Sequence, residues 1–202
     1  MSESPEFTLS KSRFEAFSDG VFAIAITLLV LEVHLPALHA PPISGAEQLR
    51  ALLQIWPQYL VYFASFATIG IMWLNHHALF RYIERITHGI VLTNLLLLAL
   101  ISFLPFPTEV LARFGLTPMA MVYYGVTLSA IALGYFLVHR QVLAAQPSVD
   151  QSLKLWNIVG LTLYPVATIV GYFVPVVGIV LVGLLAVFYM MPQNIRGAVV
   201  RP

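Results

Sequence analysis

The chain of 202 residues is strongly apolar, with 59% hydrophobic residues, only 9% charged residues and a mean hydropathy of +0.87. Soluble domains carry about 25% charged residues, so too few charges are present to cover a surface that faces water. This composition excludes a disordered chain, a nucleic-acid-binding protein and an ordinary soluble enzyme. The absence of cysteine excludes disulfides, thiol catalysis and cysteine-bound zinc. The chain is therefore expected to lie in a lipid bilayer.

Six apolar segments follow one another along the chain, each near the roughly 20 residues that a spanning helix needs. They cover residues 14–33, 52–74, 90–106, 119–138, 155–174 and 176–191. No strand-like alternation runs over ten-residue windows, so a barrel is not expected. The sequence predicts an all-α membrane protein in which six transmembrane helices form a single domain over residues 1–202.

Prolines interrupt two segments and separate two others. Pro57 and Pro165 fall inside the second and fifth segments, where each predicts a kink that neighbouring helices can accommodate. Pro175 stands between the fifth and sixth segments and predicts a tight hairpin there.

The distribution of lysine and arginine predicts the orientation, because cytoplasmic loops are enriched in these residues. With six spans, only Arg50 and Arg113 lie on one side. The remaining eight lie on the other side, namely Lys11, Arg13, Arg81, Arg85, Arg140, Lys154, Arg196 and Arg201. Both termini are therefore expected in the cytoplasm. The first residues contain acids and no small-residue cleavage site, so no signal peptide is expected.

The first segment places an acid inside a spanning helix. The run RFEAFSDG, from Arg13 to Gly20, puts Asp19 more than one turn into the segment. An ionisable group at membrane depth needs a partner or water, so this run indicates an ion path or a structural polar network. Alternatively, the helix begins later and Asp19 is only its N-cap.

The same helix carries a stripe of large aliphatic side chains. At about 100° per residue, Ile24, Leu28 and Leu31 fall on one line, Thr27 flanks them, and Asp19 lies on the opposite face. Such a stripe is either a packing seam between helices or the wall of a narrow pore. In the second case several copies meet at an axis, and rings of aliphatic side chains gate by dewetting.

A second polar run, Trp73-Leu-Asn75-His76-His77, ends the second segment. The predicted topology puts it on the same side as Asp19, so a pair of Asp19 with His77 or Arg13 can neutralise the buried acid.

Other chemistry at these residues is less favoured. A metal site of His76, His77, His88 and Asp19 is disfavoured because adjacent histidines point to different sides of a helix. Hydrolysis by Ser18 and His77 would need a strained elbow and oxyanion donors, and the sequence shows neither. Thr93 and Asn94 in the third segment are expected to form hydrogen bonds between helices.

The run Arg13-xxx-Phe17-Ser18-Asp19 resembles the signature of the transmembrane-protein-175 potassium channels, which are the endolysosomal potassium channel of animals and its bacterial relatives. The run Trp73-x-Asn75-His76-His77 is similar to the bacterial branch of this family. One six-span unit in 202 residues resembles the bacterial form.

This resemblance implies a homotetrameric, potassium-preferring cation channel in a bacterial cell membrane, without a re-entrant filter loop. The first helix would line the pore, with Ile24, Leu28 and Leu31 as its constriction and Thr27 taking part in selectivity. A polar network behind that helix would consist of Arg13, Phe17, Ser18, Asp19, Trp73, Asn75, His76 and His77. The resemblance implies no enzymatic activity, and no cofactor apart from the permeant potassium ions.

Three alternatives stay open. One is a secondary transporter or proton pathway that uses Asp19 and His77. Another is a membrane enzyme with histidine and Asp19 as metal ligands, and the third is a structural membrane protein.

Overall fold

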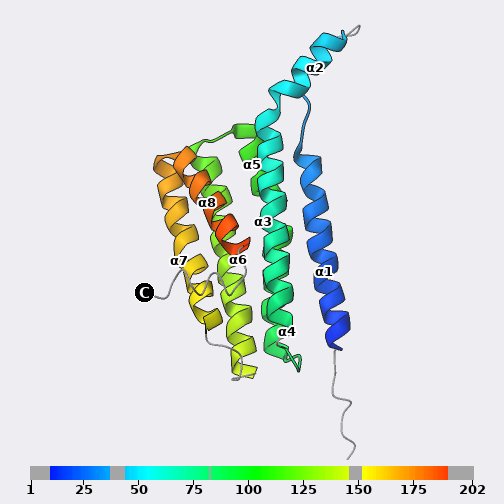
Figure 1. Cartoon of the computed structure of the whole chain (residues 1–202), viewed down its shortest axis with the longest axis vertical. Helices are drawn as coiled ribbons and strands as arrows, with labels where there is room; N and C mark the ends of the chain where they lie inside the picture. Colours follow the sequence, from blue (N-terminus) through cyan, green and yellow to red (C-terminus); the bar gives the residue numbers. More distant parts are fainter. Residues whose placement is uncertain (1–9, 37–43, 82, 146–151, 191–202) are drawn as a thin grey trace, which may run out of the picture.

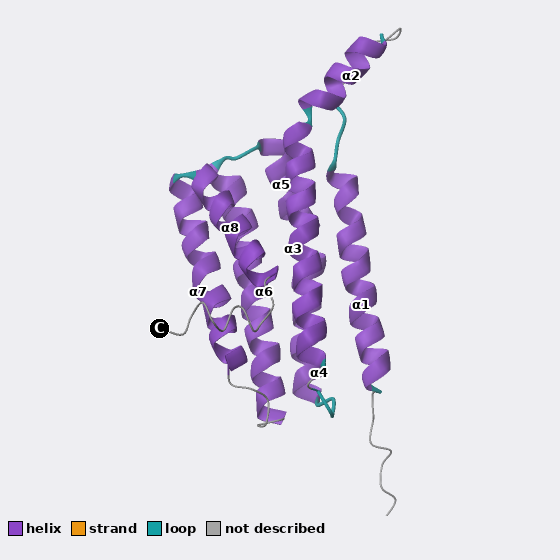
Figure 2. Cartoon of the chain, in the orientation of Figure 1, coloured by secondary structure: helices purple, strands orange, loops and turns teal. Residues whose placement is uncertain are grey.

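The computed structural model describes residues 10–36, 44–81, 83–145 and 152–190, and all regular elements among them are helices (Figure 2). In chain order they are α1 (Lys11–Leu28), the 3₁₀ turn η1 (Leu29–Glu32), α2 (Gly45–Gln54), α3 (Trp56–Phe80), α4 (His88–Ser102), α5 (Pro105–Phe114), α6 (Pro118–Ala145), α7 (Ser152–Phe173) and α8 (Pro175–Met190). The all-helical prediction is confirmed for these residues.

Several of these helices match the dimensions of a bilayer. Lys11–Glu32, His88–Phe114 and Pro118–Ala145 are each long and apolar enough to span it, and the bent pair of α2 and α3 adds a fourth candidate. Ile158–Phe173 and Pro175–Met190 are shorter apolar helices that fall in the fifth and sixth predicted segments. The count of six spans therefore stays a prediction.

Two helix boundaries differ from the predicted segments. α3 continues to Phe80, so the run from Trp73 to His77 lies inside a helix and does not end it. The predicted third segment is divided, because α4 ends at Ser102 and Pro105 opens α5. Proline is favoured in the first turn of a helix, where its missing N–H has no intrahelical partner to lose.

The two interrupting prolines differ in their positions. Pro57 also lies in a first turn, that of α3, and the chain bends by 47° between α2 and α3 just before it. Pro165 lies inside α7, as expected from the sequence.

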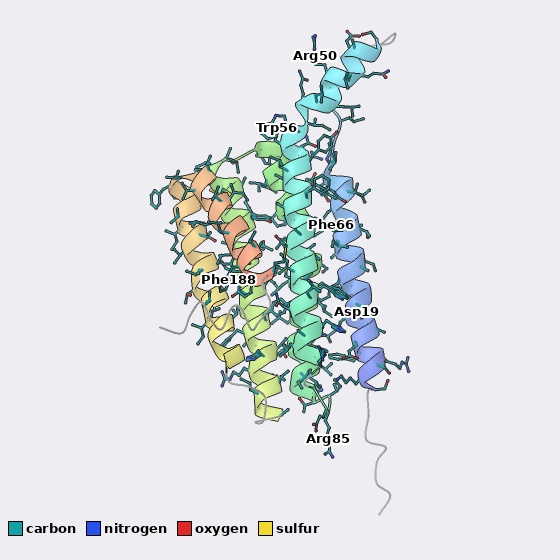
Figure 3. All side chains as sticks on the ribbon, viewed as in Figure 1. Asp19, Arg50, Trp56, Phe66, Arg85 and Phe188 are labelled. Carbon is teal, nitrogen blue, oxygen red and sulfur yellow. The ribbon has the colours of Figure 1, made fainter. Side chains whose placement is uncertain are left out.

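Apart from α2, which projects beyond one end, the helices stand side by side in one bundle, with α1 and α7 at opposite edges (Figure 1). α6 lies in the interior and packs on α4, α5 and α7, while α1 packs mainly on α3 and α4. Arg85 marks one end of the bundle, where α1 begins, and Arg50 on α2 marks the other (Figure 3). We call these the Arg85 end and the Arg50 end.

A buried cluster of hydroxyl groups holds α5 in the bundle. Ser65 Oγ on α3 lies 3.0 Å from Thr108 Oγ1 on α5 and 3.4 Å from the hydroxyl oxygen of Tyr124 on α6. Thr108 Oγ1 also donates to the Leu104 carbonyl at 2.9 Å. Because buried hydroxyls need partners, these bonds fix the short helix after the Ser102–Pro105 break against two long neighbours.

The predicted hairpin at Pro175 is confirmed, and its two helices touch through glycines. Only Val174 lies between α7 and α8. A Cβ atom built on Gly178 would overlap the backbone of Gly171 and approach the Met121 side chain to 3.0 Å. The close approach of α8 to α7 therefore depends on the missing side chain at Gly178.

Replacing Gly178 with valine is expected to lower the apparent melting temperature of the purified protein in detergent. The added side chain must push α8 off the backbone of Gly171, and overpacking of this kind costs about 1–3 kcal/mol. Gly183→Val is the matched control, since Gly183 lies in the same helix and a Cβ atom added there would meet no atom within 4 Å. Equal melting temperatures for the two variants would contradict the close contact.

Candidate functional site: the polar network behind an exposed aliphatic stripe

α1 has one buried face and one exposed aliphatic face. The buried face consists of residues spaced three or four apart, as expected for one side of a helix, and its members are Phe14, Ser18, Phe22, Ala25 and Leu29. On another side of the helix, Ile24 is 61% exposed, Leu28 41% and Leu31 65%. Within the chain, the stripe is therefore not a packing seam.

A buried amide joins three helices behind that stripe. Asn94 Nδ2 on α4 donates to Ser18 Oγ on α1 at 3.0 Å, and Ser18 Oγ donates to the Phe14 carbonyl at 3.0 Å. Asn94 Oδ1 lies 2.8 Å from His76 Nε2 on α3. Since an amide oxygen only accepts, His76 donates this bond and carries its proton on Nε2. We call Ser18, Asn94 and His76 the buried triad.

Aromatic rings enclose the imidazole of the buried triad. Phe80 stacks on His76 with ring centroids 3.9 Å apart, and Phe22 of α1 lies 5.2 Å from His76 on a tilted plane. Phe14 in turn stacks on Phe80 at 5.6 Å. Because these rings surround the imidazole, they shield the hydrogen bonds of the triad from water. Phe14 and Phe22 belong to α1 and the other rings to α3, so the contacts also set which side of α1 faces α3.

Asp19 binds the indole of Trp73. Trp73 Nε1 on α3 donates to Asp19 Oδ1 at 2.8 Å, and His77 stacks on the Trp73 ring at 5.9 Å. The bond lies beside a cavity of about 340 Å³ between α1 and α3. The same two helices are thus joined on both sides of Phe22, by the triad and by the Asp19–Trp73 pair.

The structure excludes the N-cap alternative for Asp19 and corrects its expected partner. α1 begins at Lys11, so Asp19 lies in its third turn and is not an N-cap. Within the described part of the chain, Trp73 is the hydrogen-bond partner of Asp19, in place of the expected His77 or Arg13. The indole N–H satisfies the carboxylate without placing a second charge at membrane depth.

The other predicted network residues lie apart from the buried triad. Arg13 and Phe17 are exposed on α1, and His77 is exposed beside Trp73. Asn75 Nδ2 donates to the Ile71 carbonyl of its own helix at 3.0 Å. Among the described residues, no three side chains of His, Asp or Glu converge in a way that could hold a metal ion.

Asn94 was predicted to form hydrogen bonds between helices, but its partners were not predicted. It forms bonds between helices as predicted, but its partners are the motif residues Ser18 and His76. Thr93 was expected to act in the same way, and this is wrong, since its hydroxyl donates to the Gly89 carbonyl of its own helix at 2.8 Å. The signal available in the sequence was an amide in the middle of a long apolar run.

A polar cluster at the Arg50 end was missed by the sequence reasoning. The His34 backbone N–H, just after η1, donates to Gln58 Oε1 on α3 at 2.8 Å. Arg113 Nη2 on α5 lies 3.3 Å from His34 Nε2 and 2.7 Å from Glu109 Oε1. These contacts hold the segment that follows α1 and η1 against α3 and α5 at the Arg50 end.

Replacing Asp19 with alanine is expected to reduce the yield of folded, assembled protein and to leave ion permeation unchanged in the protein that does assemble. The variant removes the hydrogen bond that Trp73 Nε1 donates to Asp19 Oδ1, and we expect a loss of about 1 kcal/mol because both side chains are partly exposed. Trp73→Phe, which keeps a ring and removes only the donor, is expected to act in the same direction. His77→Ala is the control. Normal yield with altered selectivity would reverse the structural role of Asp19.

The chain is similar in sequence and in structure to known membrane channels. The sequence profile described as "Endosomal/lysosomal potassium channel TMEM175" matches residues 13–105, a range that contains the stripe, the buried triad and the Asp19–Trp73 pair. The crystal structure of a lysosomal potassium-selective channel TMEM175 homolog from Chamaesiphon minutus superposes with a TM-score of 0.80 at 36% identity. That match covers 91% of this chain and 98% of the other.

Three relatives give the extent of the sequence similarity. A potassium channel of Chamaesiphon minutus is 47% identical over 137 residues, which span 66% of each chain. The endosomal/lysosomal proton channel TMEM175 of Gallus gallus is 44% identical over 111 residues, 53% of this chain and 22% of that protein. A potassium channel of a Chryseobacterium strain is 31% identical over 193 residues, 92% of this chain and 95% of the relative. The chain therefore belongs to the TMEM175 family of membrane ion channels.

Proposed function

We propose that the chain forms a homotetrameric, potassium-preferring cation channel of the bacterial cell membrane, in which α1 of each subunit lines the pore. The observation that carries this proposal is the exposed stripe of Ile24, Leu28 and Leu31 on a helix whose other side is fixed by the buried triad. The bacterial relatives are named potassium channels. In this proposal the Arg85 end faces the cytoplasm.

The chemistry of the stripe supports a constriction that works without ion ligands. Four residues of α1 separate Ile24 from Leu28 by about 6 Å along the axis, and three residues of the 3₁₀ turn η1 separate Leu28 from Leu31 by about 6 Å, so four copies would form three stacked aliphatic rings. Rings of this kind repel water when narrow and conduct when they widen or hydrate. The constriction would thus act as both gate and barrier.

Thr27 is the polar group nearest to that constriction on α1. Its hydroxyl donates to the Ala23 and Ile24 carbonyls, each at 2.9 Å, so its proton is used within the helix. The hydroxyl oxygen keeps a lone pair that can face a cation. This geometry supports a part for Thr27 in selectivity.

Recordings from purified protein in planar bilayers test the proposal. We expect unitary currents whose reversal potential follows the potassium gradient when sodium is the other cation. The rival transporter, using Asp19 and His77, predicts saturable and coupled flux without unitary steps. That result, or sodium and potassium permeating equally, would contradict the proposed function.

Proton conduction is a second candidate, since the Gallus gallus relative is named a proton channel. Asp19 and His77 are titratable groups that both contact the Trp73 ring, Asp19 at its N–H edge and His77 on its face. Proteoliposomes loaded with a pH-sensitive dye would acidify under a proton gradient, and Asp19→Asn would slow that flux if the carboxylate takes part. Unchanged proton flux in this variant would exclude Asp19 from the path.

A further inference from the structure

α2 has an apolar face that the rest of the chain does not cover. Leu49, Leu52 and Leu53 are between 44% and 64% exposed and lie within one arc of the helix, and Trp56, the first residue of α3, is 60% exposed next to them. The charged and amide side chains Glu47, Arg50 and Gln54 occupy the opposite arc. Only Ala51 of α2 is buried. The helix is thus amphipathic with its apolar side bare.

A helix of this length needs a partner to stay ordered. α2 has ten residues, and isolated helices shorter than about 12–15 residues are marginal in water. A capping box starts it, in which Ser44 Oγ accepts from the Glu47 N–H and the Glu47 carboxylate accepts from the Ser44 N–H. A cap is worth only about 1 kcal/mol, so burial of the apolar arc against a surface outside the chain would add to the stability of α2.

A bilayer surface fits α2 poorly. A helix bound at the interface lies in the membrane plane, at about 90° to a spanning helix, whereas α2 bends by 47° from α3. Ten residues rise about 15 Å, so at 47° the far end of α2 stands roughly 10 Å beyond Trp56 along the axis of α3. Interfacial helices are also rich in lysine and arginine, and α2 carries Arg50 alone, balanced by Glu47.

The direction of α2 favours a neighbouring subunit. In Figure 1, α2 extends beyond the bundle and leans toward the side on which α1 stands. Figure 3 shows Arg50 and Trp56 at this end, away from Asp19 and Arg85. Exposed aliphatic side chains also follow α1 at this end, where Leu31 in η1 and Leu35 just after it are each 65% exposed. An apolar α1 face and an apolar α2 arc therefore occur at the same edge of the chain.

We infer that the apolar arc of α2 docks on a second copy of this chain at the outer mouth of the assembly. The inference rests on the proposed function, because it needs the homotetramer with α1 at its axis. It adds a contact outside the membrane, where burial of leucine and tryptophan from water stabilises association.

Spin labels on single cysteines test this contact, and the chain offers a clean background because it contains no cysteine. A nitroxide attached to the cysteine of Leu49→Cys lies at the centre of the apolar arc, and one attached to Leu52→Cys gives a second position on the arc. Gln54→Cys on the polar arc is the water-exposed control, and Leu92→Cys, 54% exposed on α4, is the control within the membrane. Collision rates with oxygen and with a water-soluble nickel chelate are measured in proteoliposomes.

We expect both arc labels to be severalfold less accessible to the nickel chelate than the Gln54 label. They should also be severalfold less accessible to oxygen than the Leu92 label, because protein covers them. High oxygen accessibility at Leu49 and Leu52 would assign the arc to lipid, and high nickel accessibility would leave it in water. Either result overturns the inference.

The oligomeric state of the same samples separates the two proposals. Tetramers with accessible arc labels would overturn the α2 contact and leave the proposed channel standing. A monomer, shown by cross-linking in the proteoliposomes or by the mass of the detergent-solubilised protein, would overturn both the α2 contact and the proposed channel.

Discussion

Replacing Ile24 with asparagine is expected to increase the open-channel current and to reduce the discrimination between potassium and sodium. An amide at the first aliphatic ring holds water, so the dewetted barrier falls. A decrease of about 1.4 kcal/mol in that barrier raises the current tenfold. The measurement is the current and the reversal potential in planar bilayers under a potassium gradient against sodium.

Ile24→Leu is the matched control for this prediction. Leucine keeps the volume and apolar character of the ring, so currents close to those of the unsubstituted protein are expected. Asparagine and leucine variants with the same current and reversal potential would remove Ile24 from the pore wall.

Replacing Asn94 with leucine is expected to produce the largest loss of stability. The variant leaves the Nε2–H of His76 without its acceptor and Ser18 Oγ without its donor, and both groups are almost fully buried, at 2% and 0% exposed. The unpaired His76 Nε2–H costs about 1–3 kcal/mol, and Ser18, which keeps its bond to the Phe14 carbonyl, loses one further hydrogen bond of about 1 kcal/mol. Because hydrogen bonds between membrane helices are worth less on average, we expect a total of about 3 kcal/mol.

The measurement is the apparent melting temperature in detergent, together with the fraction of protein recovered as assembled channel. Thr93→Ala is the control, since Thr93 is the adjacent residue and its hydroxyl bonds only within α4. A melting temperature for Asn94→Leu as high as for Thr93→Ala would show that the buried triad does not hold α1 in place.

The two sides of α1 could be predicted from the sequence because they depend only on helical periodicity. In a helix with 3.6 residues per turn, Ile24, Leu28 and Leu31 lie on one side, and Asp19 lies on another. The hairpin at Pro175 was also predictable, because proline ends one helix and opens the next at its first position.

The partners of Ser18 and Asp19 could not be predicted in the same way. Ser18 and Asn94 are 76 residues apart, and their contact depends on the azimuth at which α1 packs on α3 and α4. The end of α3 was misplaced for a related reason. Asn75, His76 and His77 have the polarity of a helix end, but stacking on Phe80 and a bond to Asn94 satisfy His76 inside the helix.

The α2 helix was missed because its apolar residues are few. Leu49, Leu52 and Leu53 are the leucines of its apolar arc and Pro57 follows soon after them, so the apolar stretch is far shorter than the roughly 20 residues of a spanning segment. Its start became clear only from the capping box of Ser44 and Glu47.

The most direct test of the central claim, that α1 lines the pore, is modification of a cysteine at Ile24 during recording. The chain contains no cysteine, so Ile24→Cys channels carry one thiol per subunit, which binds silver ions from the bath more tightly than the methionine and histidine side chains do. We predict rapid and complete block of Ile24→Cys currents, with no effect of silver on Leu92→Cys or on the unsubstituted protein. Ile24→Cys currents that persist unchanged in silver, in channels that otherwise conduct normally, would contradict the claim.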